Sequence, residues 1–235
     1  MERIDKIISS QTQYSRKKIK ELIHKKRIAV NEKIITNSNF KIDIESDKIF
    51  IDGKEIIIKN NIYLILNKPK GYISATEDKK MKTVLDLVPS EYMHRNLFPA
   101  GRLDKDTTGL IIITDDGDFV HNILSPKKHV AKTYNVTIDI PVTHEMIEGF
   151  KNGVMLNDGI CKSAVLEQTE KNTAIVTITE GKYHQIKRMF GCYGAKVLEL
   201  QRIGIGNFKL PADLKLGDCR ELTEEELNQV KLYYL

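Results

Sequence analysis

The chain has 235 residues, of which 41% are hydrophobic and 29% are charged, and its net charge is +5. This composition is typical of a globular protein with a substantial core, and no stretch approaches the roughly 20 apolar residues that a membrane span requires. The three cysteines lie far apart without a Cys-x-x-Cys pair, which argues against a disulfide framework or a zinc site. We therefore expect a protein of the reducing cytoplasm.

The positive charge is concentrated near the N-terminus. Residues 1–60 contain 14 Lys and Arg against 9 Asp and Glu, whereas the rest of the chain contains 23 of each. A local excess of this kind suits a module that binds a polyanion such as RNA, although a solvated lysine-rich surface would have the same composition.

The first 60 residues are expected to form a small α/β unit. Ile4, Ile7 and Ile8 recur at helical spacing, and Ser15 is a suitable N-cap for a second helix. Short β-like runs follow at 27–30, 33–35 and 48–51, and the last of these ends at Asp52-Gly53, a strong hairpin signal. The segment 59–61 is a candidate linker.

The remainder predicts an α+β domain. Apolar or alternating runs predict strands at 62–66, 110–114, 132–140 and 174–178, and helical patterns cover 118–124, 144–151 and 184–193. Strands and helices do not alternate regularly, which argues against a doubly wound parallel sheet.

Two segments combine charges in ways that could serve chemistry. The first, 100–110, places Asp104 between Arg102 and Lys105 in a loop just before an apolar strand. On spacing alone, a salt-bridged surface turn is the more frequent explanation.

The second segment, 180–190, places His184, Lys187 and Arg188 on one helix face at i, i+3 and i+4 spacing. That face could bind phosphate or neutralise a carboxylate. The sequence contains no phosphate-binding loop, no dinucleotide fingerprint and no His-Glu-x-x-His motif.

Taken in order, four motifs resemble the pseudouridine synthases that modify ribosomal RNA of the small subunit. The motifs are Asn67–Gly71, Gly101–Leu110, Lys132–Tyr134 and Gly181–Phe190. The resemblance covers nearly the whole chain, and residues 1–59 resemble the S4-like RNA-binding domain that often precedes such enzymes. It implies an α+β catalytic domain, residues 60–235, with a largely antiparallel mixed sheet and a central cleft.

The resemblance also implies the activity and its partners. We expect isomerisation of one uridine in 16S ribosomal RNA to pseudouridine without cofactor or metal. The expected substrate is small-subunit ribosomal RNA, either naked or in an assembly intermediate with ribosomal proteins, and the expected state is a monomer without membrane attachment.

Specific residues acquire roles through the same resemblance. Asp104 matches the catalytic aspartate, and Tyr134 matches a tyrosine that stacks on the uracil. Lys187 stands where many relatives carry an arginine that pairs with the aspartate, although lysine cannot form the bidentate fork of arginine. Arg102 matches an arginine that lies against the RNA near the extruded base. Further RNA contacts are predicted at Lys68, Arg16, Lys17, Lys18, Lys20, Lys25, Lys26, Arg27, Lys182, His184 and Arg188.

The predicted chemistry is physically consistent. The target nucleotide must leave its stack, and an ionised carboxylate can then attack the ring, attack the sugar or deprotonate the sugar. The sequence leaves these three routes open. It also leaves two alternative functions: a non-catalytic RNA-binding assembly factor, and a glycoside hydrolase that would need a second acid such as Asp106 or Asp116.

Overall fold

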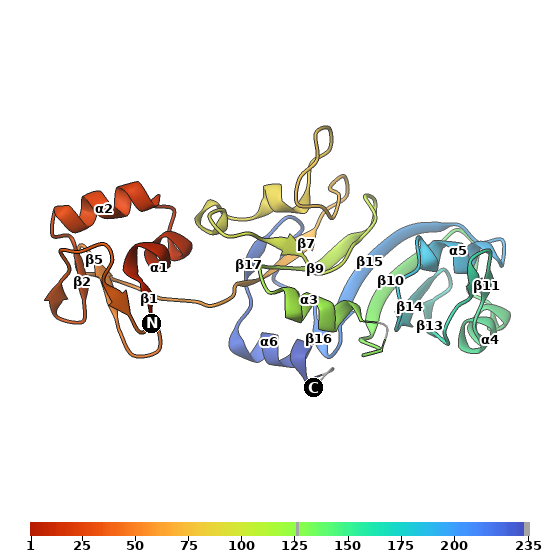
Figure 1. Cartoon of the computed structure of the whole chain (residues 1–235). Helices are drawn as coiled ribbons and strands as arrows, with labels where there is room; N and C mark the ends of the chain where they lie inside the picture. The colour runs from red at the N-terminus through yellow and green to blue at the C-terminus, as the bar shows by residue number, and fades with distance from the viewer. Residues whose placement is uncertain (126, 233–235) are drawn as a thin grey trace. The chain divides into compact units, whose positions relative to one another are not determined.

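The computed structural model describes residues 1–125 and 127–232, and the chain forms two compact units (Figure 1). The N-terminal unit comprises Met1–Ile62 and Pro89–Asn96, and the C-terminal unit comprises Tyr63–Val88 and Leu97–Leu235. The domain boundary between residues 59 and 60 stays a prediction. The sequence did not indicate that 89–96 groups with the first unit.

The N-terminal unit packs two helices on small sheets. Its elements are β1 (Glu2–Arg3), α1 (Ile4–Gln11), α2 (Arg16–His24), β2 (Ile28–Val30), β3 (Lys33–Ile34), β4 (Lys41–Ile42), β5 (Ile49–Ile51) and β6 (Lys54–Ile56). The strands form an antiparallel sheet in the order β3-β2-β5-β6 and a separate β1-β4 pair.

Two local signals in this unit are confirmed. The Ser15 hydroxyl accepts a hydrogen bond from the backbone N–H of Lys18 at 3.2 Å, which caps α2. Asp52 and Gly53 adopt φ values of 53° and 76°, so this pair forms the turn between β5 and β6. The core consists mainly of isoleucines on the buried faces of α1, α2, β2 and β5.

A hydrogen-bonded clamp holds the predicted linker. The Arg95 guanidinium donates to the backbone carbonyls of Ser10 at 3.3 Å, Lys59 at 3.1 Å and Asn60 at 2.9 Å. The Gln11 side chain also exchanges hydrogen bonds with the Lys59 backbone. The segment at residues 59 and 60 is therefore fixed within the N-terminal unit.

The C-terminal unit contains a nine-stranded mixed sheet with helices. Its strands are β7 (Tyr63–Lys68), β8 (Phe98–Pro99), β9 (Thr108–Thr114), β10 (Lys132–Ile138), β11 (Met155–Leu156), β12 (Gly159–Ile160), β13 (Val165–Glu170), β14 (Thr173–Ile178), β15 (Val197–Ile205), β16 (Phe208–Lys209) and β17 (Cys219–Glu221), and its helices are α3 (Gly117–Leu124), α4 (His144–Asn152), α5 (Gln185–Gly191) and α6 (Glu224–Lys231). The main strand order is β13-β14-β10-β15-β9-β7-β17, with β16 beside β15 and β8 beside β9.

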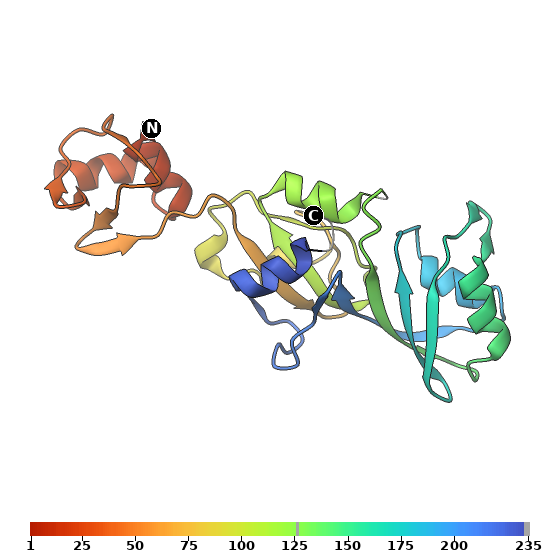
Figure 2. The ribbon, with the colours of Figure 1, turned by 90° about the horizontal axis from the view of Figure 1, so that it is seen from below.

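The sheet is largely antiparallel, as the sequence predicted. Among the described strands of this sheet, only β9 and β15 pair in parallel, through Gln201 opposite Thr108 and Arg202 opposite Gly109. Figures 1 and 2 show α3 and α6 beside the β7–β9 half of the sheet and α4 and α5 beside the β13–β14 half. The α+β class is therefore confirmed.

The helices bury apolar residues against the sheet. Phe119 and Ile123 of α3 and Val230 of α6 share a core with residues of β7, β9 and β15. Asp116 and Thr223 cap α3 and α6 through side-chain oxygens that accept backbone N–H groups. This core supports β9, the strand that directly follows the Asp104 loop.

The parallel junction requires a glycine. Gly109 has a φ of +101°, and a Cβ added to it would lie 2.8 Å from the backbone nitrogen of Arg202 and closer still to its carbonyl oxygen. Only glycine therefore allows β9 and β15 to approach at this point. The junction fixes the end of the loop that carries Asp104.

Candidate active site

Side chains from two other segments anchor the Asp104 loop through hydrogen bonds to the backbone of the loop. The Ser74 hydroxyl donates to the Leu103 carbonyl at 3.1 Å and accepts the Leu103 N–H at 2.9 Å. Within the loop, the Thr107 N–H donates to the Asp104 carbonyl at 3.1 Å. Leu103 is buried, so Asp104 follows a residue that is held in the core.

Lys68 provides a second anchor for the same loop. Its side chain is fully buried, and its ammonium donates to the carbonyls of Asp104 at 3.0 Å, Lys105 at 3.3 Å and Thr107 at 2.8 Å. Burial lowers the pKa of Lys68 to about 8. The ammonium is held by carbonyls of the chain itself and the side chain is closed to solvent, and the RNA contact predicted for Lys68 stays a prediction.

The Asp104 carboxylate lies between two basic side chains of the 184–187 segment. Lys187 Nζ is 3.2 Å from Asp104 Oδ2, within salt-bridge reach, as the sequence predicted. His184 Nε2 is 3.5 Å from Asp104 Oδ1. The Asp104 side chain is 27% exposed, so it is screened by protein on most sides and still open to a substrate.

Asp106 shares the same lysine, which the sequence did not indicate. Lys187 Nζ donates to the two Asp106 carboxylate oxygens at 2.7 Å and 2.9 Å, closer than to Asp104. The hydrogen bond from Lys187 lowers the pKa of Asp106. Although burial opposes the charge on Lys187, its hydrogen bonds to Asp106 and Asp104 raise its pKa. The site therefore holds two carboxylates around one ammonium.

Other predicted site residues occupy separate places. Tyr134 lies on β10 opposite Arg202 of β15, and its side chain is 7% exposed. Arg102 is exposed at the start of the loop. Among the side-chain hydrogen bonds and ion pairs of the described residues, none joins Tyr134 or Arg102 to Asp104, so their roles stay predictions.

Lys182 and Arg188 contact a second cluster around Asp158. The Lys182 ammonium donates to the carbonyls of Gly159 at 2.7 Å and Ile160 at 3.1 Å, and Arg188 forms an ion pair with Asp158 at 2.5 Å. Both side chains thus stabilise the β11–β12 hairpin beside α5. Their predicted RNA contacts remain untested.

The predicted cations of the first 60 residues are exposed in the N-terminal unit. Four of them lie on α2 and three follow it: Arg16, Lys17, Lys18 and Lys20, then Lys25, Lys26 and Arg27. Arg27 is already engaged, because it forms a two-pronged ion pair with Asp52.

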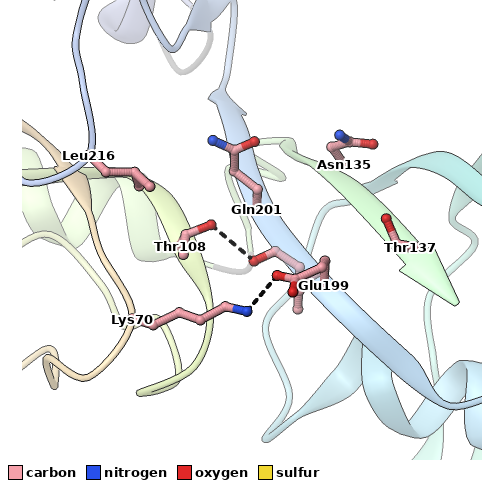
Figure 3. Close-up of a pocket in the computed structure, with 8 residues that line it drawn as sticks. Lys70, Thr108, Asn135, Thr137, Glu199, Gln201 and Leu216 are labelled. Atoms are coloured by element: carbon pink, nitrogen blue, oxygen red, sulfur yellow. Dashed lines mark hydrogen bonds and ion pairs between the residues drawn. The ribbon is translucent and has the colours of Figure 1, made fainter.

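The C-terminal unit also contains a cavity of about 470 Å³ at the β9–β15 junction (Figure 3). Asn135 and Thr137 line it from β10, and Figure 3 shows Thr108 and Gln201 facing it from β9 and β15. Asn135 follows Tyr134 along β10, so the two side chains point to opposite faces of the sheet. The cavity therefore lies on the face opposite the Tyr134 side chain. Asp104 is not among its lining residues, and the predicted central cleft at Asp104 stays a prediction.

The described residues provide no metal site and no membrane helix. They contain no group of three or more His, Cys, Asp or Glu side chains placed to hold a metal ion. Within the same residues, no helix has the length and apolar character needed to cross a bilayer.

Comparison with known proteins identifies the family. The model of the RNA pseudouridylate synthase family matches residues 62–191, and the S4 domain model matches residues 2–55. The chain therefore belongs to the RNA pseudouridylate synthases and carries an N-terminal S4 domain.

Individual relatives extend over nearly the full length. The chain is 42% identical to ribosomal small subunit pseudouridine synthase A of Escherichia coli (strain K12), over 97% of this chain and 99% of the relative. It is 39% identical to an uncharacterized RNA pseudouridine synthase of Bacillus subtilis (strain 168), over 96% and 97%. A crystal structure of a pseudouridylate synthase superposes with a TM-score of 0.69 at 34% identity, covering 98% of this chain and all of that one.

Proposed function

We propose that this pseudouridine synthase isomerises a uridine of small-subunit (16S) ribosomal RNA and that Asp104 is its catalytic residue. The observation that carries the proposal is the pairing of the partly open Asp104 carboxylate with Lys187 Nζ at 3.2 Å. The loop that presents this carboxylate is anchored by Lys68 and Ser74, so the group is preorganised.

The chemistry requires an ionised and oriented carboxylate. The uracil must be detached from its sugar, rotated and rejoined through carbon, and attack on the ring, attack on the sugar and deprotonation of the sugar all begin from the charged form of Asp104. Lys187 orients the Asp104 carboxylate through the ion pair at 3.2 Å. The proposal needs no redox step and no cofactor.

Tyr134 and Arg102 complete the proposed site. Tyr134 would offer an aromatic face to the extruded uracil, since aromatic rings stack on unpaired bases. Arg102 follows Gly101 at the exposed start of the same loop and would contact the RNA backbone beside the target.

The choice of small-subunit RNA rests on the relatives. The Escherichia coli relative named for the ribosomal small subunit aligns from end to end with this chain. The exposed cations of α2 would contact the phosphates of this RNA. Cytoplasmic location, a monomeric state and the use of naked RNA or an assembly intermediate stay predictions.

Substitution of the two neighbouring carboxylates tests the catalytic assignment. We expect Asp104→Asn to abolish formation of pseudouridine in a 16S ribosomal RNA fragment, because the amide is neither a nucleophile nor a base. Asp106→Asn is the matched control, since Asp106 contacts the same lysine, and this variant should retain turnover. RNA affinity and the unfolding midpoint should be similar in both variants.

The outcomes separate the possible roles. Multiple turnover by pure Asp104→Asn protein would refute the role of Asp104, and loss of turnover only in Asp106→Asn would transfer the role to Asp106. A wild-type protein that binds the RNA but modifies no uridine would support a non-catalytic assembly factor.

A further inference from the structure

Tyr183 is an exposed aromatic residue next to the Asp104 site. Its side chain is 75% exposed, and it lies in the turn between β14 and α5. A single exposed aromatic side chain is not informative by itself. Its stacking partner and the rigidity of its turn distinguish this one.

The Tyr183 ring is linked to Asp104 through one intervening side chain. The rings of Tyr183 and His184 are stacked, with centroids 3.8 Å apart and planes inclined by 19°. His184 in turn places Nε2 3.5 Å from Asp104 Oδ1. One face of the Tyr183 ring is therefore covered by His184, and its high exposure leaves the other face open to solvent.

The turn that carries Tyr183 is pinned on both sides. On one side, the buried Gln185 side chain accepts the Lys182 N–H at 2.9 Å and donates to Glu180 at 2.8 Å. On the other side, Arg188 donates to the Tyr183 carbonyl at 3.0 Å. The aromatic ring is thus presented from a backbone with little freedom to collapse onto the protein.

His184 adopts a strained backbone conformation at this point. Its φ of 48° and ψ of 34° lie in the left-handed region, which non-glycine residues seldom occupy. Strain of this kind persists where the surrounding structure enforces it, and it is concentrated at functional sites. The conformation holds the His184 ring between Asp104 and Tyr183.

We propose that the open face of Tyr183 stacks on the base adjacent to the target uridine, with His184 as the rigid backing of this platform. The proposal rests on the proposed function, because extrusion of a uridine leaves the neighbouring base without a stacking partner on one face. An aromatic ring replaces that partner, as in the recognition of single-stranded RNA. A neutral ring with an open face suits a base better than a phosphate.

Fluorescence of a labelled RNA tests the contact directly. In a 16S ribosomal RNA fragment that the wild-type chain modifies, 2-aminopurine replaces the nucleotide on the 5′ side or the 3′ side of the target. We expect the full-length wild-type protein to quench one of the two labels. Tyr183→Leu should lose that quenching and Tyr183→Phe should retain it, because Phe keeps the aromatic face.

Kinetics provide the second readout. Loss of one base–aromatic stack weakens binding by roughly 5- to 150-fold, so KM of Tyr183→Leu should rise within that range. Its kcat at saturating RNA should stay unchanged, and Tyr183→Phe should match the wild type in both parameters. The unfolding midpoint should not change, since the side chain is mostly exposed.

Three results would overturn the platform. The first is quenching and KM in Tyr183→Leu equal to the wild-type values. The second is a KM defect shared by Tyr183→Phe, which would assign the effect to the hydroxyl. The third is a defect seen only on an assembly intermediate, which would indicate a protein partner. Failure of the proposed function is distinguishable, because the wild-type chain would then form no pseudouridine.

Discussion

The electrostatics of the candidate site depend on one residue, Lys187. Its ammonium forms ion pairs with the carboxylates of both Asp104 and Asp106. Because hydrogen bonds to Asp106 raise its pKa against the effect of burial, Lys187 keeps its charge across the neutral range. An arginine at this position would bind one carboxylate through a two-pronged fork, whereas lysine acts as a point charge between two.

Replacing Lys187 with methionine should slow the chemistry more than it weakens RNA binding. Loss of a hydrogen bond to a charged group costs about 1.5–3 kcal/mol, so kcat should fall by roughly 10- to 150-fold. Single-turnover rates and RNA affinity should be measured together, with Lys187→Arg as the charge-preserving control. If only affinity changed, Lys187 would be a phosphate contact.

At the candidate site, the sequence predicted the partner of Lys187 but not the burial of Lys68. The resemblance to the pseudouridine synthases implied that Lys187 pairs with Asp104, and the two groups lie 3.2 Å apart. The burial of Lys68 could not be predicted in this way, because it depends on carbonyls of residues that lie 36 to 39 positions further along the chain. A basic residue beside a Pro-Lys-Gly turn gives no sign of whether it faces solvent or a backbone loop.

At the scale of elements, apolar patterning located some strands and missed others. Runs such as 110–114 and 174–178 coincide with β9 and β14. Strand β15 was missed because Glu199, Gln201 and Arg202 interrupt its apolar pattern. It forms through pairing with β10 on one side and β9 on the other, which is tertiary information that local periodicity does not contain.

The geometry of the β9–β15 junction predicts that Gly109→Ala destabilises the protein. Alanine at a φ of +101° is strained, and its Cβ would press against the Arg202 backbone. We expect the free energy of unfolding to fall by roughly 1–3 kcal/mol from backbone strain alone. Activity should fall as well, because the Asp104 loop ends at this junction.

Urea unfolding of matched variants measures the effect. Gly117→Ala is the control, since Gly117 begins α3 and an added Cβ there would meet nothing within 4 Å. The control should unfold at the wild-type midpoint or above it. Equal midpoints for both variants would show that the junction tolerates a side chain and that the strand separation is adjustable.

At the scale of the whole molecule, the excess positive charge and the candidate site lie in different units. The N-terminal unit carries the excess of positive charge, and the C-terminal unit carries Asp104 and Lys187. Removing residues 1–59 would separate these contributions poorly, because it would also remove carbonyls that accept hydrogen bonds from Arg95. Substitutions in the full-length chain leave that clamp intact.

The last prediction uses the salt dependence of RNA affinity to separate RNA binding by α2 from the chemistry proposed at Asp104. A variant with Lys17→Gln, Lys18→Gln and Lys20→Gln removes three exposed charges from α2. If α2 binds phosphates, affinity for RNA should fall, and the slope of log affinity against log salt should flatten by roughly 0.7–0.9 for each phosphate that is no longer neutralised. Turnover on saturating RNA should persist, because Asp104 and Lys187 are untouched.

The control carries the same charge change in the other unit. Lys151→Gln, Lys171→Gln and Lys196→Gln remove three exposed lysines that no prediction places on RNA. Their salt series should follow the wild-type line, which excludes net charge as the cause of any difference. If the plots of log affinity against log salt coincide for the α2 variant and the wild type, α2 makes no phosphate contacts with this RNA. RNA binding would then depend on the C-terminal unit, where Arg102 and Arg188 would be the next residues to substitute.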